Sequence, residues 1–347
     1  MSKEFYHFTS RNNWENAPQT YRTDSIESEG FIHCSFRNQV SKSANKWAKG
    51  VDDLVLLVID PERVQAEIKY ENTSGGTEDY PHIYGELNVD AVKEVLPIPQ
   101  NDEGFHQLPE VLMRNDVRYE WILFDLDSTL LDFKETSKAA FKGALAHVGV
   151  ETKGHHYVQY NQINSVVWAD FEKGKIDTKT LRHRRFELYL KWADLPHLNP
   201  KELSELYLQN LIRYSSLWEG ARELLDDLHN EVKMAIITNG LQDVQRPRLR
   251  NLDLAKYFDT LVISDEIGFA KPDGRYFDYT FEQIGQPEKS KTLVVGDSIG
   301  SDIKGGNDYG LDTCWFNPSG GASFDGIKPK YEIKELNALK KIIGVDS

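Results

Sequence analysis

Short runs of consecutive apolar residues recur through the last two-thirds of the chain. Four are clear and a fifth is weaker: WILFDLD from Trp121, KMAIITN from Lys233, TLVISD from Thr260, KTLVVGD from Lys291 and the weaker DTCWFN from Asp312. Continuous apolar runs, as opposed to alternating ones, are typical of strands buried on both faces of a parallel sheet with helices packed outside. The pattern therefore predicts a parallel sheet in this part of the chain.

Helical patterns lie between these runs, for example GARELLDDLHNEV from Gly220 and RYFDYTFEQIG from Arg275. The alternation of strands and helices predicts a doubly wound, Rossmann-like α/β fold. Residues 137–216 break the alternation, because they offer helical segments such as KELSELYLQNLIRYSSL from Lys201 and no good strand. A helical insert after the first strand would lie above the carboxyl edge of the sheet, where open α/β sheets bind ligands.

The first third of the chain is organised differently. A length of 347 residues exceeds the roughly 100–200 residues of a typical domain, so two domains are expected. Residues Leu96–Asp116 carry three prolines and few periodic apolar positions, which predicts a boundary near residue 115. We expect a fusion of a small α+β domain, residues 1–113, with an α/β domain, residues 117–347, made of a core (117–136 and 217–347) and a helical cap (137–216).

The strands of the small domain are also visible in the apolar pattern. DLVLLVID from Asp53 predicts a buried strand. PHIYGEL from Pro81 and DAVKEVLPI from Asp90 predict another strand pair. A compact sheet with a few helices is the expected result.

Composition narrows the classes of partner. The formal net charge of −14 opposes binding to a nucleic-acid polymer, because phosphate backbones need clustered Lys and Arg. No apolar run approaches the roughly 18–20 residues that span a bilayer, and the first residues lack the layout of a secretory signal. With only Cys34 and Cys314, a disulfide framework is not expected, and we predict a cytoplasmic protein without membrane contact. The oligomeric state is left open.

Polar side chains follow the predicted strands at their carboxyl ends. Asp125 and Asp127 follow the first strand, Thr238 and Asn239 the second, Lys271 comes in a loop after the third, and Asp297 follows the fourth. A single Asp at a strand end is more often a helix cap or turn residue. Separate strands of a doubly wound sheet, however, would bring these carboxylates, the hydroxyl and the ammonium to one edge. The pattern predicts a phosphate and metal site.

Four short motifs carry a resemblance to a known family. DLDST at Asp125–Thr129, TNG at Thr238–Gly240, KPD at Lys271–Asp273 and GDSIGSD at Gly296–Asp302 resemble the motifs of the haloacid dehalogenase superfamily. The resemblance covers about residues 118–330. Within it, FDLDSTLLDF, ITNGLQDVQRPRL and EIGFAKPDGRYFDYTF resemble the pyrimidine 5′-nucleotidase branch. The resemblance implies a phosphatase that hydrolyses nucleoside 5′-monophosphates.

The resemblance also implies a role for each motif residue. Asp125 would attack phosphorus and form an aspartyl-phosphate, and Asp127 would act as general acid and then general base. Mg²⁺ would be held by Asp125, the backbone carbonyl of Asp127, and Asp297, with Asp302 orienting a metal-bound water or Asp297. Lys271 would neutralise the phosphoryl oxygens, and Thr238 with the backbone amides around Asn239 would hold them.

Asp127 separates two reaction classes. Haloacid dehalogenases use the same nucleophile on carbon but need neither this second carboxylate nor a metal, so its presence favours phosphoryl chemistry. A general sugar-phosphate phosphatase is the alternative within that chemistry. Phosphate esters are the expected small-molecule partners in either case.

The helical insert is a cap in this family, and substrate specificity is expected there. QINSVVWADFEKGKI resembles the cap of the nucleotidase branch, so candidates for contacting the base or sugar are Asn164, Trp168, Phe171, Lys175 and Arg185. Trp168 and Phe171 lie about one helical turn apart and would serve equally well as packing residues of the cap core.

The stretches EFYHFTS, SEGFIHCS, DDLVLLVID and DYPHIYGEL resemble a small bacterial family known as domain of unknown function 952. Polar residues within these stretches are candidates for lining a pocket: His7, Thr9, His33, Ser35, His82 and Tyr84. The opening His-x-Thr also resembles ADP-ribosyltransferase-like folds, whose His and Tyr hold NAD. Alternatively, these histidines are hydrogen-bonded structural residues, and the domain is a non-enzymatic sensor that regulates the phosphatase. The histidines lack the tight spacing of a zinc site.

Overall fold

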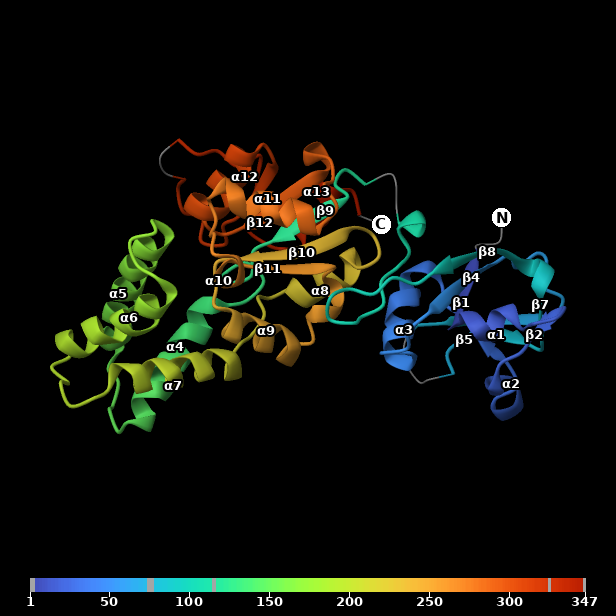
Figure 1. Cartoon of the computed structure of the whole chain (residues 1–347), viewed down its shortest axis with the longest axis horizontal. Helices are drawn as coiled ribbons and strands as arrows, with labels where there is room; N and C mark the ends of the chain where they lie inside the picture. The colour runs from blue at the N-terminus through green and yellow to red at the C-terminus, as the bar shows by residue number, and fades with distance from the viewer. Residues whose placement is uncertain (1–3, 74–77, 114–116, 324–325, 346–347) are drawn as a thin grey trace. The chain divides into compact units, whose positions relative to one another are not determined.

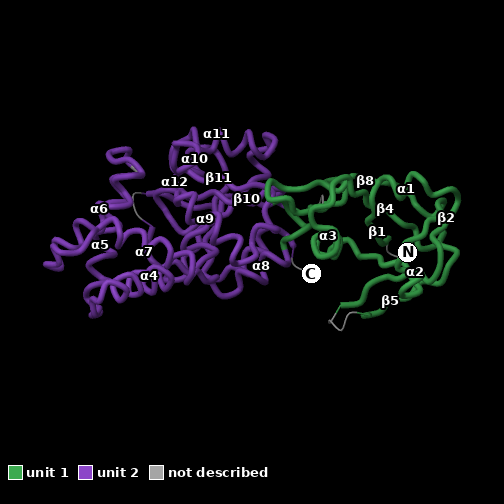
Figure 2. The backbone as a smooth tube through the Cα atoms, turned by 60° about the horizontal axis from the view of Figure 1, so that its bottom comes forward, with its two compact units in different colours: residues 1–117, 228–233 green, residues 118–227, 234–347 purple. Residues whose placement is uncertain are grey.

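The computed structural model describes residues 4–73, 78–113, 117–323 and 326–345. The chain forms two compact units, residues 1–117 with 228–233 and residues 118–227 with 234–347 (Figures 1 and 2). The predicted boundary near residue 115 lies outside the described residues. The turn at residues 228–233 belongs with the first unit, which no feature of the sequence indicated.

The second unit is built on a six-stranded parallel sheet, as the apolar runs predicted. Its strands are β9 (Trp121–Phe124), β10 (Lys233–Thr238), β11 (Thr260–Ile263), β12 (Thr292–Gly296), β13 (Asp312–Phe316) and β14 (Tyr331–Ile333). The order across the sheet is β11-β10-β9-β12-β13-β14. The order reverses between β9 and β12, which are neighbours, and this is the point where doubly wound sheets bind ligands.

Strands β9, β10 and β12 are buried almost throughout, because helices cover both faces of the sheet. The helices and turns beside the sheet are α8 (Ala221–Leu228), α9 (Gln242–Asn251), η4 (Ala255–Tyr257), α10 (Ser264–Ile267), α11 (Gly274–Gln283), η5 (Lys289–Lys291), the π-helical turn η6 (Ile299–Ile303), α12 (Lys304–Tyr309) and α13 (Ala338–Ile343). The side chain of Asp273 caps α11 by accepting from the amide of Arg275 at 2.9 Å.

The helical insert consists of α4 (Phe133–His147), α5 (Gly154–Glu172), α6 (Thr178–Trp192) and α7 (Pro200–Arg213), which stand together beyond one edge of the sheet in Figure 1. Asp132, Asp177 and Asn199 cap α4, α6 and α7 with their side chains. The predicted start of the insert at residue 137 falls inside α4, because the cap at Asp132 begins that helix at Phe133.

The core of the insert is aromatic. Phe141 and Tyr160 are stacked with ring centroids 4.5 Å apart, and Phe186 and Tyr207 pack on the same cluster. Leu241, which precedes α9, and Val244, in the first turn of α9, belong to the same buried cluster. Helix α9 is therefore the part of the sheet domain on which the insert packs.

The first unit is a small α+β structure with antiparallel sheets β1-β4-β8, β3-β6-β5 and β2-β7. Its elements are β1 (Phe5–Ser10), α1 (Arg11–Glu15), β2 (Thr20–Tyr21), α2 (Asp24–Ser28), β3 (Ile32–His33), η1 (Arg37–Gln39), α3 (Val40–Trp47), β4 (Leu54–Ile59), β5 (Glu67–Glu71), β6 (Tyr80–Tyr84), β7 (Leu87–Asn88), η2 (Val89–Ala91), β8 (Val92–Pro97) and η3 (Glu110–Leu112). The predicted strand β4 is fully buried. The strands predicted as a pair, β6 and β8, lie in different sheets, because β8 pairs with β4 and β6 pairs with β3 and β5.

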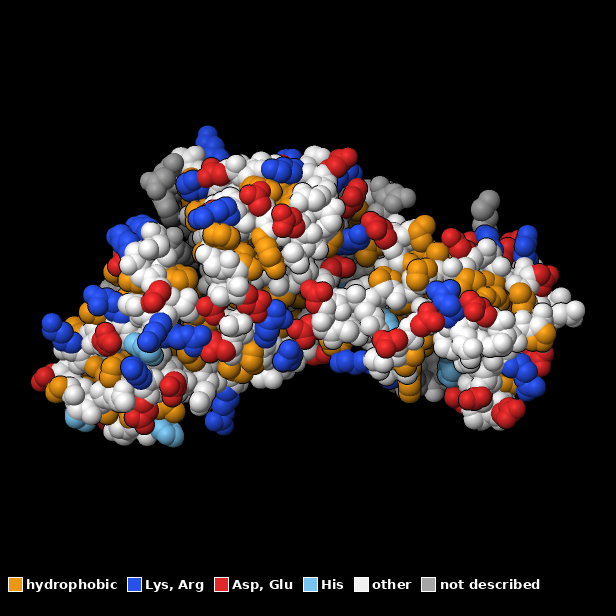
Figure 3. Space-filling view, in the orientation of Figure 1, with side chains coloured by type: hydrophobic (Ala, Val, Ile, Leu, Met, Phe, Trp, Pro, Cys, Tyr) orange, Lys and Arg blue, Asp and Glu red, His pale blue; other side chains and the backbone are white. Residues whose placement is uncertain are grey.

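The surface carries both signs of charge. On the face shown in Figure 3, Lys and Arg are interspersed with Asp and Glu over both units. Among the described residues, no helix combines the length and the apolar character needed to cross a membrane. Cys34 and Cys314 are free and buried.

Candidate active site

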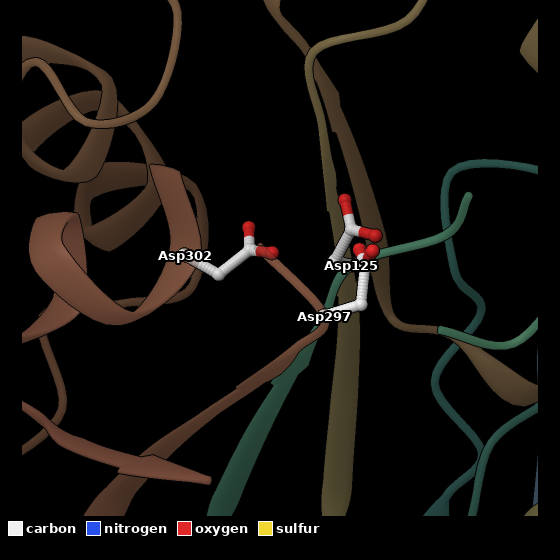
Figure 4. A group of neighbouring side chains, drawn as sticks. All are labelled: Asp125, Asp297 and Asp302. Carbon is white, nitrogen blue, oxygen red and sulfur yellow. The ribbon is translucent and has the colours of Figure 1, made fainter. Parts of the chain in front are cut away.

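Three carboxylates converge at the point where the strand order reverses (Figure 4). Asp125 follows β9, Asp297 follows the neighbouring strand β12, and Asp302 reaches in from η6. Oxygen atoms from the three side chains lie within 4.8 Å of one another. The sequence predicted Asp125 and Asp297 as metal ligands with Asp302 behind them, and the structure brings all three together.

A buried lysine ties two of these carboxylates. The Nζ atom of Lys271 donates to Asp125 Oδ1 at 2.8 Å, to Asp302 Oδ1 at 2.7 Å and to the carbonyl oxygen of Ile237 at 2.7 Å. Lys271 is 1% exposed, so its ammonium depends on these three acceptors in place of water. Burial works against its charge, but the carboxylates of Asp125 and Asp302 raise the pKa of Lys271 above its usual value.

The cluster holds more negative charge than Lys271 neutralises. Burial raises the pKa of Asp125 to about 7, and the charges of Asp302 and Asp127 add to this effect while Lys271 opposes it. Burial and the charges of Asp125 and Asp302 raise the pKa of Asp297 well above its usual value. Buried carboxylates with raised pKa values are stabilised by a cation. Three hard oxygen donors fit a divalent ion such as Mg²⁺.

The loop after β12 fits closely around Asp302. The amide of Ser298 donates to Asp302 Oδ2 at 3.0 Å. A Cβ atom built on Gly296 would lie 2.3 Å from the carboxyl carbon of Asp302. Only glycine leaves room for this carboxylate beside the strand end, which is the physical reason for a glycine at the start of GDSIGSD when Asp302 stands at its end.

Thr238 ends β10 and Asn239 follows it, and the side chains of the two residues have different partners. Thr238 Oγ1 accepts from the amide of Gly240 at 3.1 Å and from Gln245 Nε2 at 3.0 Å. The side chain of Asn239 instead holds the backbone of Lys271, accepting from its amide at 2.8 Å and donating to its carbonyl at 2.9 Å. Asn239 therefore positions the lysine loop with its side chain. Its backbone amide remains the candidate for phosphate contact.

The carboxylate of Asp127 is held by two residues that the sequence did not reveal. Gln245 Nε2 donates to Asp127 Oδ2 at 2.7 Å, and Arg248 Nη1 donates to Asp127 Oδ1 at 2.6 Å. Both lie on α9, three positions apart, and both are 1% exposed. The helical spacing after TNG was the available signal, but a Gln and an Arg on a helix ordinarily predict a solvated face.

Two of the cap candidates contact each other, and the others pack against the cap core or lie at the surface. Arg185 Nη1 donates to Asn164 Oδ1 at 3.1 Å, and Arg185 is 2% exposed. Trp168 and Phe171 pack edge to face with centroids 5.7 Å apart and lie against the cap core. Lys175 forms an exposed ion pair with Asp170 at 3.0 Å.

A cleft of 610 Å³ lies between the turn joining α5 to α6 and the loop that carries the lysine. Phe171 lines it from the insert, and Phe269 and Arg275 line it from the other side. The backbone neighbours of Lys271, residues Ala270 and Pro272, also line the cleft. It is therefore adjacent to the lysine loop, and of the predicted cap candidates it contains Phe171.

In the first unit, His7 is a buried residue with both ring nitrogens engaged. His7 Nδ1 lies 2.7 Å from the carbonyl oxygen of His33 and Nε2 lies 3.0 Å from the hydroxyl of Tyr21. Burial lowers the pKa of His7 to about 4. Thr9 is buried on the same strand. This arrangement matches a structural histidine, and Tyr21 is a partner that the sequence did not suggest.

The other predicted residues of the first unit form a second group. His33 and His82 are cross-strand partners on β3 and β6, and Phe31 packs on both rings and on Tyr84. Tyr84 donates to Glu71 Oε1 at 2.5 Å. Ser35 lies apart from this group and bonds Ser43 at 3.1 Å. Among the described residues, no group of metal-binding side chains is found in the first unit.

A doubly wound parallel sheet with a helical insert, and a lysine-tied carboxylate cluster at its switch point, places the protein among hydrolases of Rossmann-like fold that are built around an aspartate. The family of haloacid dehalogenase-like hydrolases matches residues 119–310, and the chain belongs to this family. A family of proteins of unknown function, DUF952, matches residues 8–95. Both resemblances seen in the motifs are thereby confirmed.

Relatives of known name align with the second unit. The chain is 35% identical to pyrimidine 5′-nucleotidase YjjG of Escherichia coli over 227 residues, 65% of this chain and 99% of that protein. It is 33% identical to pyrimidine 5′-nucleotidase PynA of Streptococcus pneumoniae, covering 64% of this chain and 93% of that protein. A crystal structure of the HAD-hydrolase YfnB of Bacillus subtilis bound to magnesium matches with 35% identity and a TM-score of 0.62, covering 65% of this chain and 99% of that one.

Proposed function

We propose that this protein is a Mg²⁺-dependent phosphatase that hydrolyses phosphate monoesters through an aspartyl-phosphate, with pyrimidine nucleoside 5′-monophosphates as its preferred substrates. The observation that carries the proposal is the buried cluster of Asp125, Asp297 and Asp302 around Lys271. Such a cluster needs a cation, and with that cation it suits a dianionic phosphoryl group.

The first chemical step uses Asp125 as nucleophile. A carboxylate oxygen of Asp125 bonds to phosphorus while the bond from phosphorus to the ester oxygen breaks, and the ester oxygen takes a proton from Asp127. Thr129 donates to Asp125 Oδ2 at 3.0 Å and Lys271 occupies Oδ1. These bonds fix the orientation of the nucleophile.

The second step returns the enzyme to its starting state. Asp127, now ionised, removes a proton from water as the water oxygen attacks phosphorus, and the bond between phosphorus and Asp125 breaks to release phosphate. Lys271, Thr238 and the backbone amides near Asn239 stabilise the phosphoryl oxygens in both steps. Asp125, Asp297 and the backbone carbonyl of Asp127 would hold Mg²⁺, with Asp302 behind them, and the ion would neutralise charge on the phosphoryl group.

The preference for pyrimidine nucleotides rests on the similarity to the two named nucleotidases. Asn164, Trp168 and Arg185 are the residues that we propose shape the recognition of the base. A panel of phosphate esters, assayed with Mg²⁺ and with a chelator, tests both parts. UMP and dTMP should be hydrolysed faster than purine nucleotides and hexose phosphates, and only with the metal. A preference for hexose phosphates would favour a general sugar-phosphate phosphatase.

The first unit supplies none of the residues proposed for catalysis, which all lie between Asp125 and Asp302. We propose that residues 1–113 form a separate ligand-binding or regulatory module. A chain that begins near Met113 should still hydrolyse a small activated ester if it folds. Loss of that activity from a folded fragment would show that the first unit takes part in the site. The two free, buried cysteines suit a cytoplasmic location.

A further inference from the structure

The guanidinium of Arg248 lies between the Asp127 carboxylate and the chain segment that leaves the helical insert. Its Nη1 atom donates to Asp127 Oδ1 at 2.6 Å and to Gln245 Oε1 at 2.9 Å. Its Nε atom donates to Ser215 Oγ at 2.7 Å. Arg248 is 1% exposed, and its Nη2 atom finds no acceptor among the described residues. Arg248 is therefore a buried cation, and among the described residues Asp127 is the carboxylate with which it forms a salt bridge.

Ser215 extends this contact into the insert itself. Ser215 lies just after α7, and its hydroxyl donates to the carbonyl oxygen of Leu211 within that helix at 2.6 Å. An unbroken line of hydrogen bonds thus runs from α7 through Ser215 and Arg248 to Asp127. Arg248 also lies over the ring of Phe133, the first residue of α4, at 5.8 Å from its centroid. The same guanidinium therefore contacts both chain segments that connect the insert to the sheet.

Those two segments are bonded to each other and to the turn that carries Asp127. The amide of Asp132 donates to the carbonyl of Ser216 at 3.0 Å, and the amide of Trp218 donates to the carbonyl of Leu130 at 2.9 Å. The indole of Trp218 donates to the carbonyl of Ser128 at 3.1 Å. A movement of the insert would therefore act on Arg248 and on the Asp127 turn together.

Both carboxylate oxygens of Asp127 accept hydrogen bonds here, one from Gln245 and one from Arg248. A general acid must present one oxygen, with its proton, to the leaving group. The two donors therefore set where each oxygen of Asp127 lies, and an oxygen that carries the proton can still accept a hydrogen bond from its donor.

We propose that Arg248 is a positioning residue that couples the placement of the helical insert, through Ser215, to the placement of the Asp127 carboxylate. The inference rests on the proposed role of Asp127 as general acid. Displacement of Ser215 with the insert changes the position of the guanidinium, and the guanidinium sets where the carboxylate of Asp127 lies. Substrate that draws the insert over the site would thereby bring the acid into place.

Leaving-group dependence tests this inference, because a general acid matters most when the leaving group is a poor one. The full-length protein with Mg²⁺ is assayed on nitrophenyl phosphate, a good leaving group, and on an alkyl phosphate, a poor one. The hydrolysis rate of Asp127→Asn should fall by roughly 10²–10⁴-fold on the alkyl ester and by much less on the aryl ester. Arg248→Met and Arg248→Lys should show the same asymmetry. Arg250→Met, at an exposed position on the same helix, is the matched control and should match the wild type on both esters.

Ser215→Ala tests the link to the insert, since it leaves both donors to Asp127 in place. It should lose more on the alkyl ester than on the aryl ester. In the Asp127→Asn background, Arg248→Met should reduce the rate on the alkyl ester little further, because both substitutions remove the same function.

The failures can be told apart. Equal losses on the two esters in Asp127→Asn would remove the acid role itself and with it the proposed mechanism. An asymmetric Asp127→Asn with symmetric losses in folded Arg248 variants would overturn the positioning role. If Ser215→Ala hydrolyses both esters at the wild-type rate, the proposed coupling to the insert is wrong. This result decides the question even if the Arg248 variants do not fold.

Discussion

Removal of divalent cations should make the stability of the second unit fall as pH rises from about 4 to about 7. Without a metal, ionisation of Asp125 and Asp297 places further negative charge beside Asp302. Among the described residues, Lys271 is the only cationic side chain that forms salt bridges with this cluster. The folded state therefore holds protons on Asp125 and Asp297 that the unfolded chain releases at lower pH.

The magnitude follows from Asp125 alone. Its pKa is about 7 in the folded protein against an ordinary value of 3.8. Because the folded pKa is raised, the folded state binds more protons between these two values, and stability declines as pH rises from about 4 to about 7. The difference between these two pKa values corresponds to a decrease in the free energy of unfolding on the order of 4 kcal/mol. The raised pKa of Asp297 acts in the same direction.

Chemical denaturation of the protein in chelator, across this pH range, measures the effect. Saturating Mg²⁺ should abolish most of the decline, because the ion binds the ionised carboxylates of the folded state alone. Asp125→Asn should flatten the profile in chelator, since the amide does not titrate. A wild-type stability in chelator that is constant or rises with pH, or an Asp125→Asn profile as steep as the wild type, would refute the electrostatic reasoning.

Three further outcomes are expected. Gly296→Ala should abolish most activity by displacing the Asp302 carboxylate, whereas Gly300→Ala, whose Cβ atom meets nothing within 4 Å, should remain active in the same assay; equal activities would contradict the packing argument. Lys271→Met should lower kcat by roughly 10²–10³-fold, and near wild-type turnover would exclude its role at the phosphoryl group. Because the pKa of His7 falls to about 4, its neutral form stabilises the first unit above pH about 6.5 and this stability, on the order of 3 kcal/mol, is lost as pH falls toward 4; acid denaturation should show this loss in the wild type and not in His7→Gln.

The parts of the fold that the sequence predicted are those with strong local signals. The runs at β9, β10, β11, β12 and β13 are apolar on both faces, so each was visible as a buried strand. Strand β14 was missed because it has three residues with a mixed burial pattern. In the first unit, the partner of each strand depends on contacts between segments distant in sequence, which no local pattern contains.

The candidate site was predictable where chemistry and strand ends coincide. Asp125 and Asp297 directly follow strands, and Lys271 lies in the loop beyond β11 and α10. Gln245 and Arg248 were not predicted because their function depends on which face of α9 meets the Asp127 turn, and that face is decided by packing of the insert. For the same reason the pairing of Arg185 with Asn164 became visible only in three dimensions.

The most direct test of the account is to identify the phosphorylated residue during turnover. The wild type and Asp127→Asn are mixed with Mg²⁺ and either UMP or nitrophenyl phosphate, an activated ester, and are then quenched in acid. Borohydride reduction converts an aspartyl-phosphate to homoserine, and peptide mass spectrometry locates the modified residue. The account predicts modification at Asp125 alone, and greater accumulation in Asp127→Asn with an activated ester because the second step lacks its base. Turnover without any modification at Asp125, or modification at another residue, would contradict it.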